Sequence, residues 1–293
     1  MTIALAVACG VVIGTVLGML GGGGSILAVP ALVYVLGQSA QDAVTASLVV
    51  IGISSAIGAL SYHRDRYVRW RVGLVFGVVG IGASFGGTAL NRSVDDSVLL
   101  GSFSAVMVLS AVAMLRKAVI DRRRERTAPA GPGSVAAQPE TWHGLGEDGV
   151  VAAPTRARRI VARVVPPTIS RRVVLEVLLT ALLVGFLTGF LGVGGGFIVV
   201  PALVMILRYP MPVATATSLL VIALNAGVSL AIHAGSGPSF DWAVIGPFTA
   251  ATIVASLLGK RVASHLSVRT LTFAFAGVLL AVALGIGLEV ALA

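Results

Sequence analysis

Charge and cysteine are both scarce in this sequence, and each shortage excludes a class of protein. Only 11% of the 293 residues are charged, against roughly 25% in an ordinary soluble domain. Cys9 is the single cysteine, so an internal disulfide and a cysteine-ligated metal site are excluded. The mean hydropathy is +0.99, and apolar runs of about 20 residues, long enough to cross a bilayer, recur along the chain. The composition predicts a multi-pass cell-membrane protein, of a bacterial inner or plasma membrane.

Catalytic motifs and intramembrane carboxylates are missing as well. The sequence has no ATP-binding Gly-x-x-x-x-Gly-Lys motif and no metalloprotease His-Glu-x-x-His motif. We expect no enzymatic activity, no cofactor and no bound metal. The acidic residues of the two hydrophobic halves fall at or near the ends of apolar segments, which argues against a buried proton relay. These residues are Asp42, Asp65, Asp95, Asp96, Glu176, Asp241 and Glu289.

Positive charge is concentrated between the two hydrophobic halves. The net charge is +9, and 12 of the 21 Lys and Arg residues fall between Arg116 and Arg172. Such clusters predict a cytoplasmic linker at 117–171 that attracts anionic lipid head groups. Its middle, 127–155, is rich in Pro, Gly and Ala and has no amphipathic period, which predicts disorder. Without interleaved aromatics or a folded module, we expect no nucleic-acid binding.

The two halves share a repeated sequence. Residues 14–51 align with 185–222 at a constant offset of 171, without a gap and with 17 identities in 38 positions. Farther on, one inserted residue shifts the offset to 172, which pairs Trp70 with Trp242. The chain thus divides into a first transmembrane repeat at 1–116, the linker, and a second repeat at 172–293. A glycine-broken apolar segment in both halves is a sequence pointer to the binding site of a transporter.

Apolar runs and their breaks predict ten helical segments, so the fold class is all-α. The segments are 2–20, 26–37, 42–62, 72–90, 98–116, 173–191, 197–207, 214–232, 243–259 and 270–288. The segments 26–37 and 197–207 are too short to span alone, since a helix rises 1.5 Å per residue against a core of about 30 Å. They are either stubby helices or half-helices that re-enter the membrane.

Loop charges indicate that the two repeats are inverted relative to each other. The loop 62–71 is basic, whereas its counterpart 233–241 has no Lys or Arg. The next pair reverses this bias, because 259–269 is basic and 91–97 is not. Opposite bias in matching loops predicts opposite orientation in the membrane. Inversion needs an odd number of crossings, which favours five plus five with both termini outside; four plus four with re-entrant short segments remains an alternative.

The glycine run and the segment after it carry a family resemblance. Leu-Gly-Gly-Gly-Gly-Ser-Ile-Leu-Ala-Val-Pro-Ala-Leu-Val at 20–33 matches Leu-Gly-Val-Gly-Gly-Gly-Phe-Ile-Val-Val-Pro-Ala-Leu-Val at 191–204. This doubled motif, on both sides of a basic central stretch, resembles the TauE/SafE sulfite exporter family of membrane permeases. The resemblance covers 14–115 and 185–288. It implies a permease of sulfite, sulfonates and related sulfur-containing anions that works by alternating access. The alternative is a membrane scaffold or receptor whose linker recruits a partner; the sequence indicates no oligomeric state.

The glycine runs themselves predict an anion cradle. A helix that begins after each run, at Ile26 or Phe197, would direct its unpaired amides and positive dipole end at the glycines. The predicted substrate-binding residues of the runs are Gly21, Gly22, Gly23, Gly24, Ser25, Gly192, Gly194, Gly195 and Gly196. The alternative is close helix packing, the interpretation that we favour for Gly10, Gly14 and Gly18.

Polar side chains in the segments after the short helices complete the predicted site. Thr45, Ser47, Thr217 and Ser218 could donate to an oxyanion or bond back to their own helices. Asn225 lies near the centre of an apolar segment, where an unpaired amide costs several kcal/mol. It either bridges helices or contacts the substrate.

Overall fold

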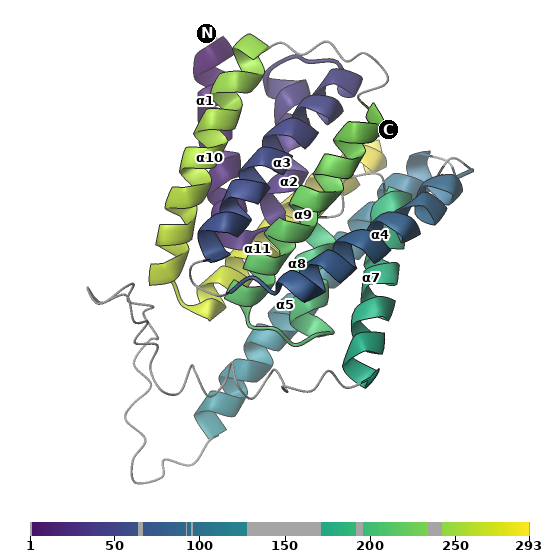
Figure 1. Ribbon diagram of the computed structural model, residues 1–293, viewed down its shortest axis with the longest axis vertical. Coiled ribbons are helices and arrows are strands. Elements are labelled where there is room, and N and C mark those ends of the chain that lie inside the picture. The colour runs from purple at the N-terminus through teal and green to yellow at the C-terminus, as the bar shows by residue number, and fades with distance from the viewer. Residues whose placement is uncertain are drawn as a thin grey trace.

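The computed structural model describes residues 2–63, 67–91, 93–94, 96–127, 171–191, 196–233 and 242–292, and these residues contain no β-strand. The first half consists of α1 (Thr2–Leu20), α2 (Gly23–Pro30), the π-helix η1 (Ala31–Val35), α3 (Ala40–His63), α4 (Trp70–Asn91) and α5 (Asp96–Thr127). The second consists of α7 (Arg171–Leu191), α8 (Gly196–Met205), α9 (Met211–His233), α10 (Trp242–His265) and α11 (Val268–Leu292) (Figure 1).

Hydropathy and length separate these helices as the sequence predicted. Eight of the described helices are long and apolar enough to cross a membrane, and two shorter apolar helical segments, Gly23–Val35 and Gly196–Met205, occupy matching places in the two halves. The all-helical, multi-pass prediction is confirmed. Pro30 and Pro201 lie inside the short helices, where the missing amide and the ring interrupt regular hydrogen bonding. The first short helix indeed changes to a π-helix directly after Pro30.

Several predicted helix boundaries differ from the structure, and the helix predicted over 243–259 continues to His265. The helix expected to end at residue 116 continues to Thr127, because a drop in hydropathy marks the edge of a membrane and does not end a helix rich in Arg, Ala and other good helix formers. The short helices begin at Gly23 and Gly196 rather than at Ile26 and Phe197. Gly22 is already helical, with φ −58° and ψ −20°, so the break is narrower than the glycine run. The predicted disorder of 127–155 falls, beyond Thr127, outside the described residues.

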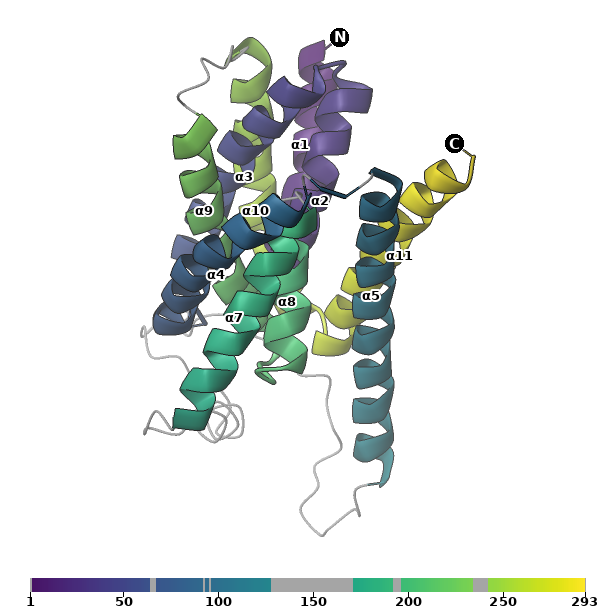
Figure 2. The same cartoon turned by 90° about the vertical axis from the view of Figure 1, so that its right-hand side faces the viewer.

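The two halves are interleaved rather than set side by side. α1 packs along α10, and α4 packs along α7, so each half encloses a helix of the other. The remaining central pairs join equivalent helices of the two halves: α3 with α9, α5 with α11 and α2 with α8. Figures 1 and 2 show the α1–α10 pair and the α4–α7 pair on different sides of the short helices. Nearly all of α8 is buried among the long helices, whereas the first short segment is buried at its start and exposed at Tyr34 and Val35.

Small residues make these close helix pairs possible. A Cβ placed on Gly10 would lie 2.7 Å from the carbonyl oxygen of Phe248, and one on Gly14 would lie 2.8 Å from the Cα of Thr252. Gly18 approaches the backbone of Ser256 in the same way, and Gly189 approaches that of Ser84. The packing interpretation of Gly10, Gly14 and Gly18 is confirmed. These helix backbones touch directly, as small-xxx-small motifs allow.

Candidate functional site

The two glycine runs meet in the interior of the bundle. A Cβ placed on Gly22 would coincide with the carbonyl oxygen of Gly196, so the two backbones are in direct contact. A Cβ on Gly196 would in turn lie 2.9 Å from the Oγ atom of Ser25. The first turns of α2 and α8 therefore face each other, and no side chain larger than hydrogen fits between Gly22 and Gly196. We call this meeting point of Gly22, Ser25 and Gly196 the glycine junction.

Gly21 turns the chain into the junction. Its φ of +73° lies in the left-handed region that favours glycine. A Cβ there would lie 2.6 Å from Ser218 Oγ and 3.1 Å from the carbonyl oxygen of Thr215. The first glycine run thus rests on the beginning of α9, a helix of the other half. The structure brings together five of the predicted site residues, namely Gly21, Gly22, Ser25, Gly196 and Ser218.

Other predicted glycines lie elsewhere or outside the described residues. A Cβ on Gly24 would lie 2.8 Å from the carbonyl oxygen of Ile13, so this residue packs against α1. Gly23 faces the ring of Phe275 of α11, at an ordinary contact distance of 3.5 Å. Gly192, Gly194 and Gly195 lie outside the described residues, and their roles stay predictions.

The predicted hydroxyls mostly bond to their own helices. Ser25 donates to the carbonyl of Gly22 at 2.7 Å, Ser47 to that of Val44 at 2.7 Å, and Ser218 to that of Thr215 at 2.8 Å. Thr45 is buried in α3. Thr217 is bonded to another helix, because its Oγ1 accepts a hydrogen bond of 3.2 Å from the backbone amide of Arg69, at the start of α4. The geometry of Thr217 favours a structural role.

Asn225 belongs to a buried polar group that sequence reasoning found only in part. Its Oδ1 atom is buried without a hydrogen-bond partner, and so are the Oγ atoms of Ser54 and Ser55. Both serines are 0% exposed. An unsatisfied buried polar atom costs about 1–3 kcal/mol, so these atoms point to a ligand or water that satisfies them. A serine in an apolar helix does not by itself indicate a site. The repeat offset of 171 pairs Ser54 with Asn225, however, and this pairing could have indicated Ser54 from the sequence.

These residues form a matching polar stripe in each half. Ser47 and Ser54 lie seven residues apart on α3, and their equivalents Ser218 and Asn225 lie seven apart on α9. Seven residues are about two turns, or about 10 Å, so each pair shares a helix face. The two helices touch on either side of the polar group. A Cβ on Gly52 would lie 3.1 Å from Cβ of Ala226, and one on Gly58 would lie 3.1 Å from Leu219.

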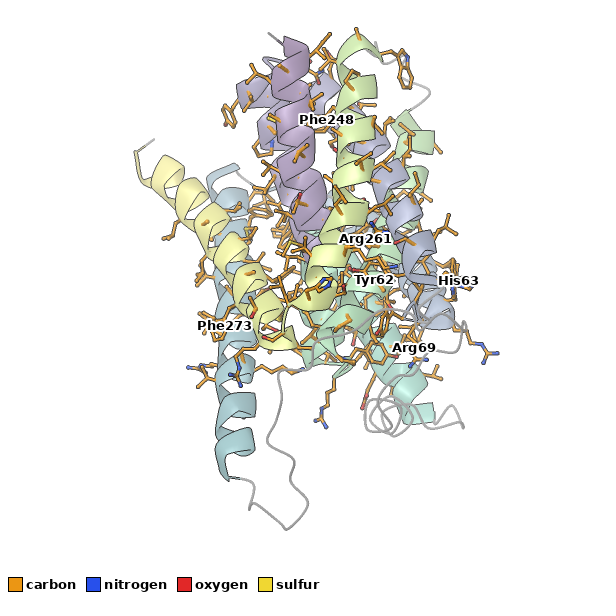
Figure 3. The ribbon with its side chains drawn as sticks, turned by 90° about the vertical axis from the view of Figure 1, so that its left-hand side faces the viewer. Tyr62, His63, Arg69, Phe248, Arg261 and Phe273 are labelled. Atoms are coloured by element: carbon orange, nitrogen blue, oxygen red, sulfur yellow. The ribbon has the colours of Figure 1, made fainter. Side chains whose placement is uncertain are left out.

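Positive charge gathers at one end of the bundle. The N- and C-termini lie toward one end, and the last turns of α5 and the first turns of α7 lie at the other (Figures 1 and 2). The residues toward this second end include Arg69, Arg71, Lys117, Arg208, Lys260, Arg261 and Arg269; Figure 3 shows Arg69 below Tyr62 and Arg261. Burial raises the pKa of the nearby Tyr209 hydroxyl, and the positive charge of Arg69 partly opposes that rise.

No catalytic arrangement is found in the described part of the chain. Those residues include no cluster of three or more His, Cys, Asp or Glu side chains that could hold a metal ion. The string Gly82-Ala83-Ser84-Phe85-Gly86 has the spacing of a hydrolase nucleophile motif, but it lies inside α4 rather than on the strand-to-helix turn that such a nucleophile needs. Ser84 donates to the carbonyl of Ile81 at 2.7 Å, and its own backbone contacts Gly189. This serine is a packing residue.

Comparisons with known proteins agree with this geometry. A family model described as "Sulfite exporter TauE/SafE" matches residues 6–286. A "Probable membrane transporter protein" of Xylella fastidiosa (strain Temecula1 / ATCC 700964) is 27% identical over 259 residues, which cover 88% of this chain and 84% of the relative. The "Probable membrane transporter protein YunE" of Bacillus subtilis (strain 168) is 26% identical over 250 residues, which cover 81% and 80%. No solved structure matches the chain.

Proposed function

Since the chain belongs to the sulfite exporter TauE/SafE family and is a multi-pass membrane transporter, we propose that it carries a small sulfur-containing oxyanion. Sulfite and sulfonates are the candidates, and their binding site lies beside the glycine junction, at the first turns of α2 and α8. The observation that carries this proposal is the direct contact of Gly22 with Gly196 at the first turns of α2 and α8.

The electrostatics of the junction favour an anion. The first four amides of a helix have no partner within it, and the helix dipole places roughly half a positive charge at that end. Two such ends that face each other in an apolar interior repel unless negative charge lies between or beside them. An oxyanion accepts several of these amide hydrogen bonds at once. The junction therefore selects for charge and size without a charged side chain.

The polar stripes of α3 and α9 extend the site beyond the amides. Ser218 faces Gly21, and Asn225 lies two turns farther along the same helix face. A serine hydroxyl that bonds to its own helix can rotate toward a ligand, and Ser54 and Ser55 have no partner to give up. An anion that leaves the junction along these stripes passes from one set of hydrogen-bond donors to the next.

Helix pairing and charge support alternating access between inverted repeats. In the repeat, α1 corresponds to α7 and α10 corresponds to α4. The contact between α1 and α10 therefore has its equivalent in the contact between α7 and α4, as a twofold relation between the halves requires. Trp70 and Trp242 are repeat equivalents that begin α4 and α10, and these helices begin at opposite ends of the bundle (Figure 1). Tryptophans at both ends are typical of the two membrane interfaces. The basic end is then cytoplasmic, and both termini are outside.

Flux through reconstituted vesicles tests the proposed substrate class. Purified protein is reconstituted and the uptake of sulfite, a small sulfonate, sulfate, chloride and an uncharged sulfur compound is compared, with and without a proton gradient. We expect saturable flux of sulfite or the sulfonate that is absent from empty vesicles. A protein that moves only the uncharged compound, or is stabilised by none of the anions, would contradict the anion cradle.

A further inference from the structure

A cavity lies at the basic end of the bundle, beside the end of α1. Its volume is about 70 Å³, and its lining includes Met19, Tyr62, Tyr67, Thr215, Lys260 and Ser264. One water needs about 10–15 Å³ measured in this way, so the cavity holds several waters or one small oxyanion. Tyr67, Lys260 and Ser264 are partly exposed, whereas Tyr62 and Thr215 are buried. The cavity therefore has a solvent-facing mouth and a buried floor.

The floor of the cavity adjoins the glycine run. Thr215 lines the cavity, and its carbonyl oxygen would lie 3.1 Å from a Cβ on Gly21. Tyr62 also lines it and donates a hydrogen bond of 3.1 Å to the carbonyl of Gly18, three residues before the run. An anion in the cavity is thus separated from the glycine junction by little more than Gly21 and the first turns of α9.

Lys260 supplies positive charge to the cavity wall. Its ammonium donates to the carbonyl of Ser61 at 2.6 Å and lies 4.6 Å from the centroid of the Tyr62 ring. These two contacts fix the long side chain beside the cavity, so little rotamer freedom is left to lose when an anion binds. An ammonium group has three N–H donors and binds oxyanions as a point charge.

We infer that this cavity is a vestibule in which Lys260 binds the transported anion before it reaches the glycine junction. The inference rests on the proposed function and adds to it a named cation and a side of entry. The surrounding Arg69, Arg261 and Arg269 raise the local anion concentration, as a basic funnel does. Tyr62 and Tyr67 give the vestibule an apolar wall, which strengthens the attraction between Lys260 and the anion.

A neutral residue takes the place of Lys260 at the other end of the bundle. The offset of 172 pairs Lys260 with Thr88, whose Oγ1 donates to the carbonyl of Ser84 at 2.9 Å and lies 3.4 Å from that of Gly189. Asn91 Nδ2 donates to the carbonyl of Phe190 at 2.6 Å, and a Cβ on Gly87 would lie 2.6 Å from the amide nitrogen of Phe190. Among the described residues of this closely packed seam, Thr88 therefore offers no ammonium group to an anion, whereas Lys260 does. We therefore expect capture of the anion by Lys260 to be a property of the basic end alone.

Lys117 serves as a matched control for a purely structural role of Lys260. Lys117 donates to the carbonyl of Val204 at 2.6 Å and so binds the last turn of α8, as Lys260 binds the last turn of α3. A cation at a helix C-terminus stabilises the dipole in both cases. Lys117 does not line the cavity. Loss of helix stabilisation therefore affects both lysines, whereas loss of anion capture affects Lys260 alone.

The test compares Lys260→Gln, Lys260→Arg and Lys117→Gln in the full-length protein, with sulfite as the probe. Initial rates are measured in inside-out and right-side-out membrane vesicles. We expect Lys260→Gln to raise KM at least tenfold for entry from the basic end, with kcat changed less than about threefold. Lys260→Arg should restore most of the affinity. Lys117→Gln should leave KM within twofold of the parent value.

A second variant avoids the Ser61 contact altogether. Ser264→Asp places a carboxylate in the vestibule and should raise KM as Lys260→Gln does, even if that variant folds poorly. Parent-like KM values for both Lys260→Gln and Ser264→Asp would overturn the vestibule. If the parent protein itself neither transports nor binds sulfite or a sulfonate, the proposed function fails instead, so the two failures are distinguishable.

Discussion

Gly196→Ala is the mildest change that reaches the glycine junction. The added methyl group would lie 2.9 Å from Ile222 Cδ1 and 2.9 Å from Ser25 Oγ. Ile222 Cγ1 lies at the same distance, so the buried side chains of Ile222 and Ser25 must each shift by a few tenths of an ångström. Alanine is a better helix former than glycine by about 0.8–1.0 kcal/mol in a helix interior. Gly196 is the first residue of α8, so only part of this gain offsets the crowding. We expect the free energy of unfolding to change by no more than about 1 kcal/mol.

The same methyl group stands where the proposed anion meets the amides of α8. A ligand at 100 times its Kd stabilises the parent by about 2.7 kcal/mol. If the methyl weakens binding tenfold, the stabilisation at the same concentration falls to about 1.4 kcal/mol. The assay is thermal unfolding of the purified protein with increasing sulfite. An unchanged sulfite-induced shift in a protein that melts earlier would refute the reasoning and leave the glycines a packing role only.

Two control variants separate packing from binding at this site. Gly24→Ala places its methyl 2.8 Å from the carbonyl oxygen of Ile13 and 2.8 Å from the amide nitrogen of Leu17. Backbone atoms cannot move aside cheaply, so this variant should lose stability and keep the sulfite-induced shift. A Cβ on Gly227 meets nothing within 4 Å, so Gly227→Ala should keep both properties.

Three further predictions concern the polar group, the topology and the linker. Ser54→Ala should raise the free energy of unfolding by about 1–3 kcal/mol, because it removes an unsatisfied buried hydroxyl, yet slow sulfite flux in vesicles; a variant that is both less stable and fully active would contradict a ligand-binding role. A reporter fused after residue 126 should be cytoplasmic and one fused after residue 236 external, and placement of both on one side would eliminate the inverted arrangement. Replacing 128–154 with a Gly/Ser spacer of similar length should leave flux largely unchanged, and a collapse of flux at normal expression would favour the scaffold alternative.

Sequence reasoning succeeded where the physical cause is local. Hydropathy predicted both ends of α1 correctly, at Thr2 and Leu20, because the apolar stretch and the helix begin and end together there. It failed for α5, whose helix continues past the apolar stretch to Thr127. The start of α2 at Gly23 depended on backbone angles at Gly21 and Gly22, which four identical glycines do not reveal.

The repeat allowed residues of the site to be predicted, but not the contacts between them. Gly22 and Gly196 were identified as site residues, but their contact joins positions 174 residues apart, and no local pattern encodes it. The same limit concealed the bond between Thr217 and Arg69, which gives Thr217 a structural partner. Ser55 became visible only through burial without a hydrogen-bond partner, a property of the folded chain alone, whereas the repeat could have indicated Ser54 as the equivalent of Asn225.

The interleaved pairing of the halves has a consequence for biosynthesis. Gly10, Gly14 and Gly18 of α1 are matched by α10, which begins at Trp242. A ribosome that adds about 5–20 residues per second needs roughly 10 to 45 s to pass from Leu20 to Trp242. Throughout that interval the grooved face of α1 lies in the bilayer without the helix that fits it. The first half is therefore inserted before its packing partner has been synthesised. We expect that neither half reaches its final packing when it is expressed as a separate polypeptide.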